Sequence, residues 1–159
     1  LEENKINGGS YRIFAKHLKN GSITINEKCS IEDVNNFKER IDQSRNDCIS
    51  YLEQELSQGK SIYGYGASTK GNVILQYYDL DNTKIKAIAD RNKLKHGSYT
   101  LTDIPIVSEE EGRTKADIFF VLPFGFIDEF VRREKDWLIN GGKFVVPLPE
   151  LRIITKDDL

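Results

Sequence analysis

The sequence predicts an α/β fold of the doubly wound, Rossmann-like type, in which a mainly parallel sheet carries helices on both faces. Segments typical of strands alternate with segments typical of helices along the chain. Several strands are apolar throughout, as in residues 118–122, which is typical of parallel sheets buried on both faces. The stretch 60–78, KSIYGYGASTKGNVILQYY, reads as a strand, a glycine turn and a helix in immediate succession.

The chain before this central unit is expected to supply one short strand and one long helix. Residues 1–9 are polar, so we interpret them as a linker from a preceding domain, followed by a single Rossmann-like C-terminal domain over 10–159. A short strand is expected at 10–16. From Ser30, a good N-cap, apolar residues recur with a helical period until Gly59. We expect this amphipathic helix to pack on the core sheet.

The chain after the central unit is expected to complete the sheet. Strands are predicted at 85–89, 104–107, 118–122, 143–147 and 151–155, and helices at 108–111 and 126–139. With 61–63 as the first strand, the natural order of the first five is 3-2-1-4-5. The ligand crevice then lies at the carboxyl ends of strands one and four, where the segments 64–71, 90–97 and 122–126 converge.

Composition narrows the class of protein. The 159 residues suit one domain, and a net charge of −2 gives no overall field that would recruit nucleic acid. No apolar run approaches the roughly 20 residues of a membrane helix, and no signal peptide opens the chain. The two cysteines lack metal-type spacing, which favours a reduced, cytoplasmic protein. The absence of methionine suggests a piece of a longer protein, which would hold only part of an active site.

The glycine turn of the central unit allows two readings. A helix that begins behind such a turn directs backbone N–H groups and its positive dipole end at one point, which suits a phosphate, and Lys70 adds a cation there. The spacing differs from the dinucleotide fingerprint, whose third glycine would fall at Thr69, and from the phosphate loop of nucleotide triphosphatases. The alternative is that Gly64 and Gly66 only let the helix pack closely on the sheet. Two roles are also open for Asp90, which could contact a ribose or simply cap its own loop.

The sequence shows no convincing catalytic set. His17 and His96 lie in polar segments and read as solvated, and the run Glu109–Glu111 reads as the solvated face of a short helix. No metal ligands or cofactor are expected within this chain. The expected crevice is instead rich in hydrogen-bond donors and cations, which suit binding of a phosphorylated ligand. These donors are Ser68, Thr69, Lys70, Arg91, Asn92, Lys93 and Lys95.

Four blocks of sequence resemble a known family. GYGASTKGN at 64–72, ADRNKLKHG at 89–97, Leu122-Pro123 and GGSYR at 8–12 are similar to the C-terminal domain of bacterial sugar C-methyltransferases. The resemblance implies an enzyme of three parts: a small zinc-binding N-terminal part, a central S-adenosylmethionine-binding domain with the catalytic base, and this domain. It implies that this domain holds a nucleotide diphosphate deoxysugar against the central domain and has no methyl-transfer activity alone.

The resemblance and the donor inventory together predict the binding residues. The diphosphate is expected to contact Gly64, Gly66, Ala67, Ser68, Thr69 and Lys70. Asp90, Arg91 and Asn92 are expected to meet the nucleoside or the sugar, and Ser10 and Arg12 to reach the ligand from the domain junction. Two alternatives stay open. One is a nicotinamide-dinucleotide-binding domain of an oxidoreductase, and the other is a Rossmann-like domain with a purely structural role.

Overall fold

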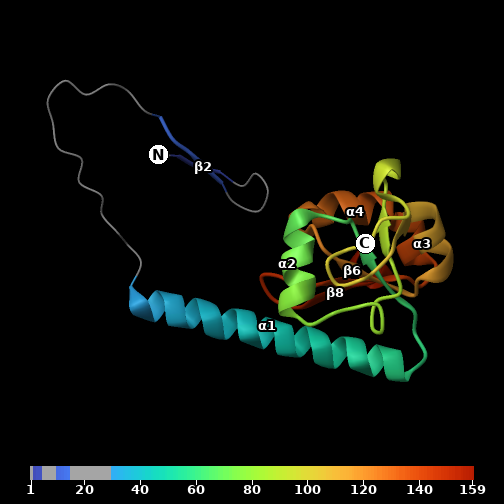
Figure 1. The fold of residues 1–159 in the computed structure, drawn as a ribbon, viewed down its shortest axis with the longest axis horizontal. Coiled ribbons are helices and arrows are strands. Elements are labelled where there is room, and N and C mark those ends of the chain that lie inside the picture. The colour runs from blue at the N-terminus through green and yellow to red at the C-terminus, as the bar shows by residue number, and fades with distance from the viewer. Residues whose placement is uncertain (1, 5–9, 15–29) are drawn as a thin grey trace, which may run out of the picture.

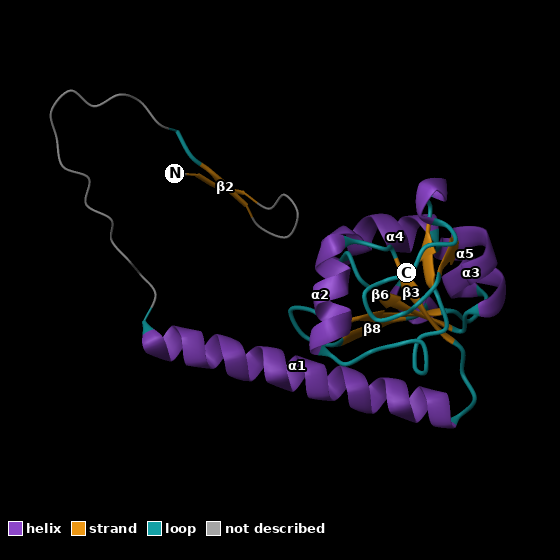
Figure 2. Cartoon of the chain, in the orientation of Figure 1, coloured by secondary structure: helices purple, strands orange, loops and turns teal. Residues whose placement is uncertain are grey.

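The computed structural model describes residues 2–4, 10–14 and 30–159, whose strands form two separate sheets (Figures 1 and 2). In the smaller sheet, β1 (Glu2–Asn4) pairs antiparallel with β2 (Ser10–Arg12). Part of the expected linker is therefore a strand, and β2 begins where the short strand at 10–16 was predicted. The rest of the linker and the end of that predicted strand lie outside the described residues.

The larger sheet has six strands in the order β5-β4-β3-β6-β7-β8. These strands are β3 (Ile62–Tyr65), β4 (Ile88–Asp90), β5 (Ile106–Ser108), β6 (Ile118–Val121), β7 (Lys143–Val146) and β8 (Arg152–Ile154). The first five are parallel to their neighbours, and β8 pairs antiparallel with β7 at the edge. The predicted α/β class and the mainly parallel sheet are confirmed.

Helices cover both faces of this sheet. On one face, α1 (Ile31–Ser57) and α2 (Thr69–Tyr77) bury apolar side chains against the strands, and on the other α4 (Ile127–Arg133) and α5 (Lys135–Ile139) do so. On that second face α3 (Glu109–Lys115), which has no apolar side chain, packs through Gly112, where an added Cβ would lie 2.7 Å from the Cβ of Ala89. Short 3-10 turns complete the fold at η2 (Lys93–Lys95), η3 (Phe124–Phe126) and η4 (Lys156–Asp158). Because successive side chains of a strand point to opposite faces, Tyr65 faces the layer of α3 to α5 whereas Ile62 faces α1 and α2.

The core under α4 and α5 is aromatic. The ring of Tyr65, fully buried, lies with its centroid 4.8 Å from that of Phe119, 5.0 Å from Phe130 and 5.5 Å from Phe144. The last two pairs meet edge to face, the geometry that aromatic quadrupoles favour. Tyr65 is therefore held rigidly, with its hydroxyl at the end of the sheet where the candidate site lies.

The predicted helix over 126–139 is divided in the structure. It begins as η3, continues as α4 and resumes as α5 after Glu134, whose backbone angles (φ −101°, ψ 20°) depart from those of a helix. Glu134 is 2% exposed, and its carboxylate accepts hydrogen bonds from Tyr65 and Arg113. The polar contacts of Glu134 are tertiary, so helical periodicity could not reveal this break.

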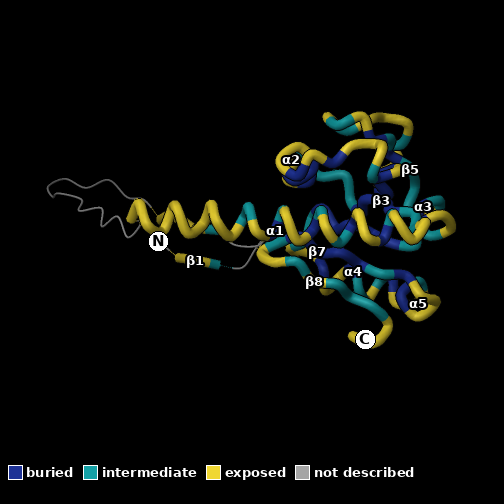
Figure 3. Tube along the Cα trace, turned by 90° about the horizontal axis from the view of Figure 1, so that it is seen from below, coloured by how far each residue is buried: buried dark blue, intermediate teal, exposed yellow. Residues whose placement is uncertain are grey.

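Only the C-terminal half of α1 packs on the sheet. Cys48 and Leu52 are fully buried, whereas Ile31, Val34 and Phe37 are exposed (Figure 3). A helix of 27 residues is about 40 Å long, and α1 runs along β7, because Ser44 bonds to Pro147 just after that strand and Glu55 bonds to Lys143 at its start. A strand of four residues spans only about 13 Å. The N-terminal half of α1 therefore extends beyond the sheet. Its apolar side chains have no packing partner among the described residues.

None of the helices in the described part of the chain has the length and apolar character of a membrane span.

Candidate functional site

A cavity of about 280 Å³ opens at the carboxyl ends of β3, β4 and β6. The three segments that were predicted to converge there all contribute to its lining, which confirms that part of the topology. Residues of α3 and α4 close the other side. The lining consists of Tyr65, Gly66, Ala67, Ser68, Asp90, Arg91, Asn92, Lys95, Glu109, Pro123, Phe126, Glu129, Phe130 and Arg133.

The turn between β3 and α2 forms one wall of the cavity. Gly66 has a φ of +81°, and a Cβ atom added there would lie 2.6 Å from Cγ of Pro123. Glycine is therefore required both by the backbone and by the space. Ser68 caps α2 by accepting a hydrogen bond of 3.0 Å from the N–H of Gly71. Thr69 and Lys70 line an adjoining cavity of about 170 Å³ that shares Ser68 with the first.

The hydrogen bonds of this turn show which N–H groups remain for a ligand. The N–H of Ala67 donates to the Asp90 carboxylate, and that of Gly71 to the Ser68 hydroxyl. Within the described part of the chain, the N–H groups of Ser68 and Thr69 have no hydrogen-bond partner. The first N–H groups of a helix lack intrahelical acceptors, so these two can donate to an anion.

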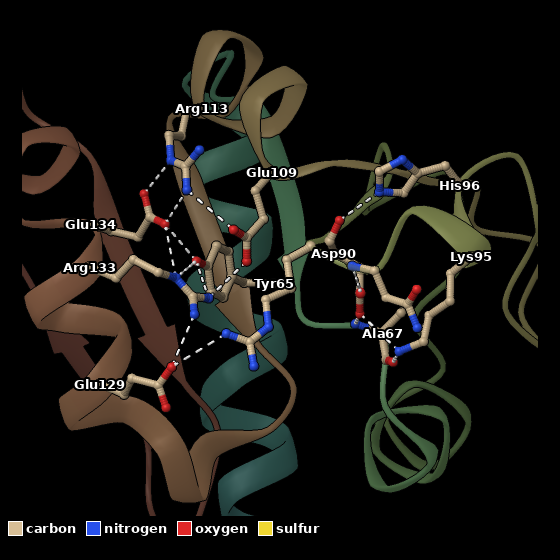
Figure 4. Close-up of polar contacts among 12 residues, drawn as sticks. Tyr65, Ala67, Asp90, Lys95, His96, Glu109, Arg113, Glu129, Arg133 and Glu134 are labelled. Atoms are coloured by element: carbon tan, nitrogen blue, oxygen red, sulfur yellow. Dashed lines mark hydrogen bonds and ion pairs between the residues drawn. The ribbon is translucent and has the colours of Figure 1, made fainter.

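Asp90, at the end of β4, uses its carboxylate inside the protein. One oxygen accepts from the Ala67 N–H at 2.8 Å and from Lys95 Nζ at 3.1 Å, and the other accepts from the Asn92 N–H at 2.7 Å (Figure 4). Lys95 also donates to the Ala67 carbonyl at 2.6 Å. Asp90 is 6% exposed. It therefore joins the turn after β3 to the loop after β4, which is closer to the structural alternative than to a ribose contact.

His96 lies in the same loop and is half-buried, not solvated as predicted. Its Nε2 is 2.8 Å from the backbone oxygen of Asp90, so the ring supports the end of β4. The other histidine, His17, lies outside the described residues.

A polar network lies behind the opposite wall of the cavity. The Tyr65 hydroxyl donates to Glu134 at 2.6 Å and accepts from Arg133 Nη2 at 2.7 Å. Arg113 donates to both Glu134 oxygens, one of them at 2.6 Å, and to Glu109 at 3.3 Å. Arg133 donates to Glu109 at 2.8 Å, which closes the network across α3 and α4 (Figure 4).

Burial and hydrogen bonding shift the pKa values of this network. Burial raises the pKa of the Glu134 carboxyl, but the bonds from Arg113 and Tyr65 outweigh it and leave that pKa below its ordinary value. Burial and the adjacent Glu134 charge raise the pKa of Tyr65, which stays protonated and donates. The hydrogen bond to Glu134 raises the pKa of Arg113. The network is therefore a set of fixed charges at neutral pH.

Several lining residues had no role in the sequence prediction. Glu109 was expected on a solvated helix face, and this is wrong: its side chain is 13% exposed and contacts two arginines. The spacing of Glu109 and Arg113, one helical turn apart, was an available signal. The contributions of Glu129 and Arg133 depend on how α4 packs over Tyr65, which no local pattern indicates. Phe126, in contrast, belongs to the segment 122–126 that was predicted to reach the crevice.

Three predicted site residues do not line the cavity. Gly64 lies inside β3, where an added Cβ would collide with the side chain of Ile88, so close packing explains this glycine. Ser10 and Arg12 lie on β2, and Arg12 is 3.6 Å from the Glu2 carboxylate. The other eight predicted residues line the main cavity or its neighbour, and they are Gly66, Ala67, Ser68, Thr69, Lys70, Asp90, Arg91 and Asn92.

The described residues contain no group of three or more His, Cys, Asp or Glu side chains arranged to hold a metal ion. Burial raises the pKa of the Cys48 thiol to about 12, so this cysteine is protonated and a poor nucleophile. What the cavity offers is donors on one wall and fixed charges on the other, an arrangement suited to binding.

Comparisons with known proteins identify the family of the chain. Residues 5–149 match the family described as C-methyltransferase C-terminal domain. The chain is also similar to the C-methyltransferase NovU of Streptomyces niveus, with 36% identity over 104 residues, which are 64% of this chain and 25% of NovU. The match thus spans a quarter of the length of that relative. The chain belongs to the family of C-methyltransferase C-terminal domains.

Proposed function

We propose that this domain binds a nucleotide diphosphate sugar on behalf of an S-adenosylmethionine-dependent C-methyltransferase that acts on a keto-deoxysugar. The observation that carries the proposal is the cavity at the N-terminus of α2, with its donor-rich turn, in a chain of this family. A cavity at the carboxyl ends of parallel strands is the usual ligand position in open α/β sheets.

The diphosphate fits the turn between β3 and α2. The N–H groups of Ser68 and Thr69 point from the start of the helix, and Lys70 lines the adjoining cavity. Gly66 lines the cavity beside this turn, and its lack of a side chain makes room for Pro123, so it shapes the wall. Ala67 lines the cavity between Gly66 and Ser68.

The remaining predicted residues fall into three groups. Arg91 and Asn92 follow β4 and line the cavity where a nucleoside or sugar would extend from the diphosphate. Asp90 and Gly64 act through structure, Asp90 by holding the turn and Gly64 by letting β3 and β4 pack closely. We propose that Ser10 and Arg12 contact the ligand, on the basis of the family resemblance alone.

The chemistry is proposed to take place elsewhere in the enzyme. The methyl donor S-adenosylmethionine and the catalytic base are assigned to an upstream domain of the same polypeptide, and zinc to a small N-terminal part. S-adenosylmethionine would supply the methyl group to a sugar carbon that becomes nucleophilic when a proton beside a keto group is removed. The role of this domain is to hold the nucleotide end of the substrate.

The two alternatives can each be distinguished from this proposal. The oxidoreductase reading differs in the role of Asp90, and the structural reading differs in whether the domain binds a nucleotide. A nicotinamide-dinucleotide site would use Asp90 for the ribose, but both Asp90 oxygens already accept hydrogen bonds from within the protein. The nucleotide-sugar reading does not need that carboxylate. A purely structural domain would bind no nucleotide at all.

The test is calorimetric titration of UDP, dTDP, UDP-glucose and dTDP-glucose into the parent chain and Lys70→Ala. Loss of one charge-assisted hydrogen bond to phosphate weakens binding about ten- to a hundredfold. The free energy of unfolding should change by less than about 0.5 kcal/mol. Lys86→Ala is the control, because Lys86 is also exposed but lies two residues before β4, away from the cavity lining. Absence of binding to the parent would favour the structural alternative, and equal affinity of the two variants would remove Lys70 from the site.

A further inference from the structure

The cavity has two chemically different ends. The end at α2 carries backbone donors, with the cation of Lys70 in the adjoining cavity, whereas the end at α4 carries the Glu129 carboxylate. A nucleotide sugar also has two kinds of group: a diphosphate, which accepts hydrogen bonds, and hydroxyl groups, which donate them. If the diphosphate lies at α2, the hydroxyl groups need a carboxylate or a similar acceptor on the far side.

Among the described residues that line the cavity, one of the three carboxylates is the most accessible for that purpose. Asp90 has both oxygens bonded inside the protein, and so has Glu109, which is held by Arg113 and Arg133. The side chains of Asp90 and Glu109 are 9% and 13% exposed, respectively, against 48% for Glu129. Within the described part of the chain, every contact of the Glu129 carboxylate is made by its Oε1, so Oε2 has an open acceptor.

Glu129 is also held in place. Its Oε1 accepts from Arg133 Nη1 at 3.1 Å and lies 3.8 Å from Arg91 Nη1. Arg133 is fixed in turn by the Tyr65 hydroxyl and Glu109, and its guanidinium lies 5.1 Å from the centre of the Phe130 ring. Figure 4 shows this chain of contacts leading from the buried tyrosine to Glu129.

The charges near Glu129 let a carboxylate remain beside an anionic ligand. Arg91 and Arg133 flank it on the cavity side and offset its charge. Without them, a carboxylate near a diphosphate would oppose binding. With them, the open Oε2 can accept a hydrogen bond from a hydroxyl group at a modest electrostatic cost.

We propose that Glu129 is a specificity-determining residue that accepts a hydrogen bond from a hydroxyl group of the bound nucleotide sugar. This inference rests on the proposed function. The hydroxyl group belongs either to the ribose or to the hexose, and the probes below distinguish the two. An oxygen acceptor rejects analogues that lack the hydroxyl, so the contact would set which nucleotide sugars the domain accepts.

The experiment compares Glu129→Gln with Glu111→Gln in the 159-residue chain. Glu111 makes an ion pair of the same spacing with Lys115 and is 41% exposed, but it does not line the cavity. Both variants lose one half-exposed pair within a helix, and Glu129→Gln also loses the 3.8 Å pair with Arg91. Equal melting temperatures would show that they lose equal stability. The titrants are inorganic pyrophosphate, UDP, dTDP and UDP-glucose.

We expect Glu129→Gln to bind pyrophosphate as the parent does and to bind UDP-glucose about tenfold more weakly, with Glu111→Gln unchanged. If UDP already shows the loss and dTDP shows less, the hydroxyl is the ribose 2′-OH. If UDP and dTDP show it equally, it is another ribose hydroxyl, and if only UDP-glucose does, it belongs to the hexose. Equal or tighter binding of all four titrants by Glu129→Gln would overturn the inference.

The failure of this inference differs from the failure of the proposed function. A parent chain that binds none of the nucleotides refutes the nucleotide-sugar proposal itself. A parent that binds them, with a Glu129→Gln variant of the same affinity, refutes only the role of Glu129.

Discussion

The hydroxyl of Tyr65, the last residue of β3, donates a 2.6 Å hydrogen bond to Glu134, which lies between α4 and α5. This contact joins two residues that are 69 positions apart, and both side chains are almost wholly buried. The same hydroxyl accepts from Arg133, so the wall of the candidate site is bonded directly to the core of the sheet.

Tyr65→Phe should destabilise the protein by about 1.5–3 kcal/mol, because it removes a hydrogen bond to a buried charge and leaves the ring packing intact. Chemical denaturation of parent and variant measures this change. Tyr77→Phe is the matched control: Tyr77 also donates to a carboxylate, that of Asp42, but both residues are exposed. Its effect should stay below about 0.5 kcal/mol. Similar losses in the two variants would contradict the importance of burial at Tyr65.

The Glu134 carboxyl should make the stability depend on acid pH. Its pKa is lower in the folded chain than its ordinary value of 4.5, so the folded state binds fewer protons. Its contribution is therefore complete above about pH 4.5 and is lost as the pH falls through the folded pKa. Glu134→Gln should be less stable than the parent by about 3 kcal/mol at pH 7, as for a broken buried ion pair.

The measurement for Glu134 is urea denaturation at several pH values from 7 to 3. The difference between parent and Glu134→Gln should shrink below pH 4.5, because the parent itself becomes protonated there. A difference that is the same across this range would show that the charge of Glu134 does not contribute.

Gly66→Ala should destabilise the protein by more than Gly97→Ala. Both glycines have a φ of +81°, so each alanine carries the same backbone penalty of about 1–2 kcal/mol. An added Cβ at Gly66 meets Pro123 at 2.6 Å, whereas at Gly97 it meets nothing within 4 Å. The clash should add about 1–3 kcal/mol at Gly66 alone. Thermal denaturation of the two variants decides this, and equal losses would show that Pro123 moves aside freely.

The chain by itself should not transfer a methyl group. The sequence predicts no catalytic set in this chain, and the proposed donor site lies in another domain. Incubation with radiolabelled S-adenosylmethionine and a nucleotide-linked keto-deoxysugar should give no labelled sugar, while the full-length enzyme under the same conditions serves as the positive control. Labelled product from the chain alone would refute this division of roles.

The sequence was informative where structure follows from neighbouring residues. The capping of α1 by Ser30, the glycine turn at Gly66 and the buried parallel strands all depend on local patterns. The convergence of three loops into one cavity followed from the rule that ligands lie at the carboxyl ends of such sheets. Those features therefore could be predicted from the chain alone.

The sequence was uninformative where a side chain chooses between distant partners. Spacing alone placed Asp90 either at a ribose or in a loop cap, and only its contacts with Ala67 and Lys95 distinguish the two. Glu109 looked solvated because its second arginine, Arg133, comes from another helix. The exposed start of α1 escaped prediction for a similar reason, since periodicity reports an apolar face but not the length of the strands beneath it.

The bonds of Asp90 have a consequence for the energetics of binding. They tie the loop after β4 to the turn after β3 through Ala67 and Lys95 before any ligand arrives. Both loops are therefore preorganised, and the conformational entropy of ordering them is lost during folding and not during association. A ligand entering this cavity would lose little binding free energy to the ordering of these loops. A few contacts there would therefore suffice for measurable affinity.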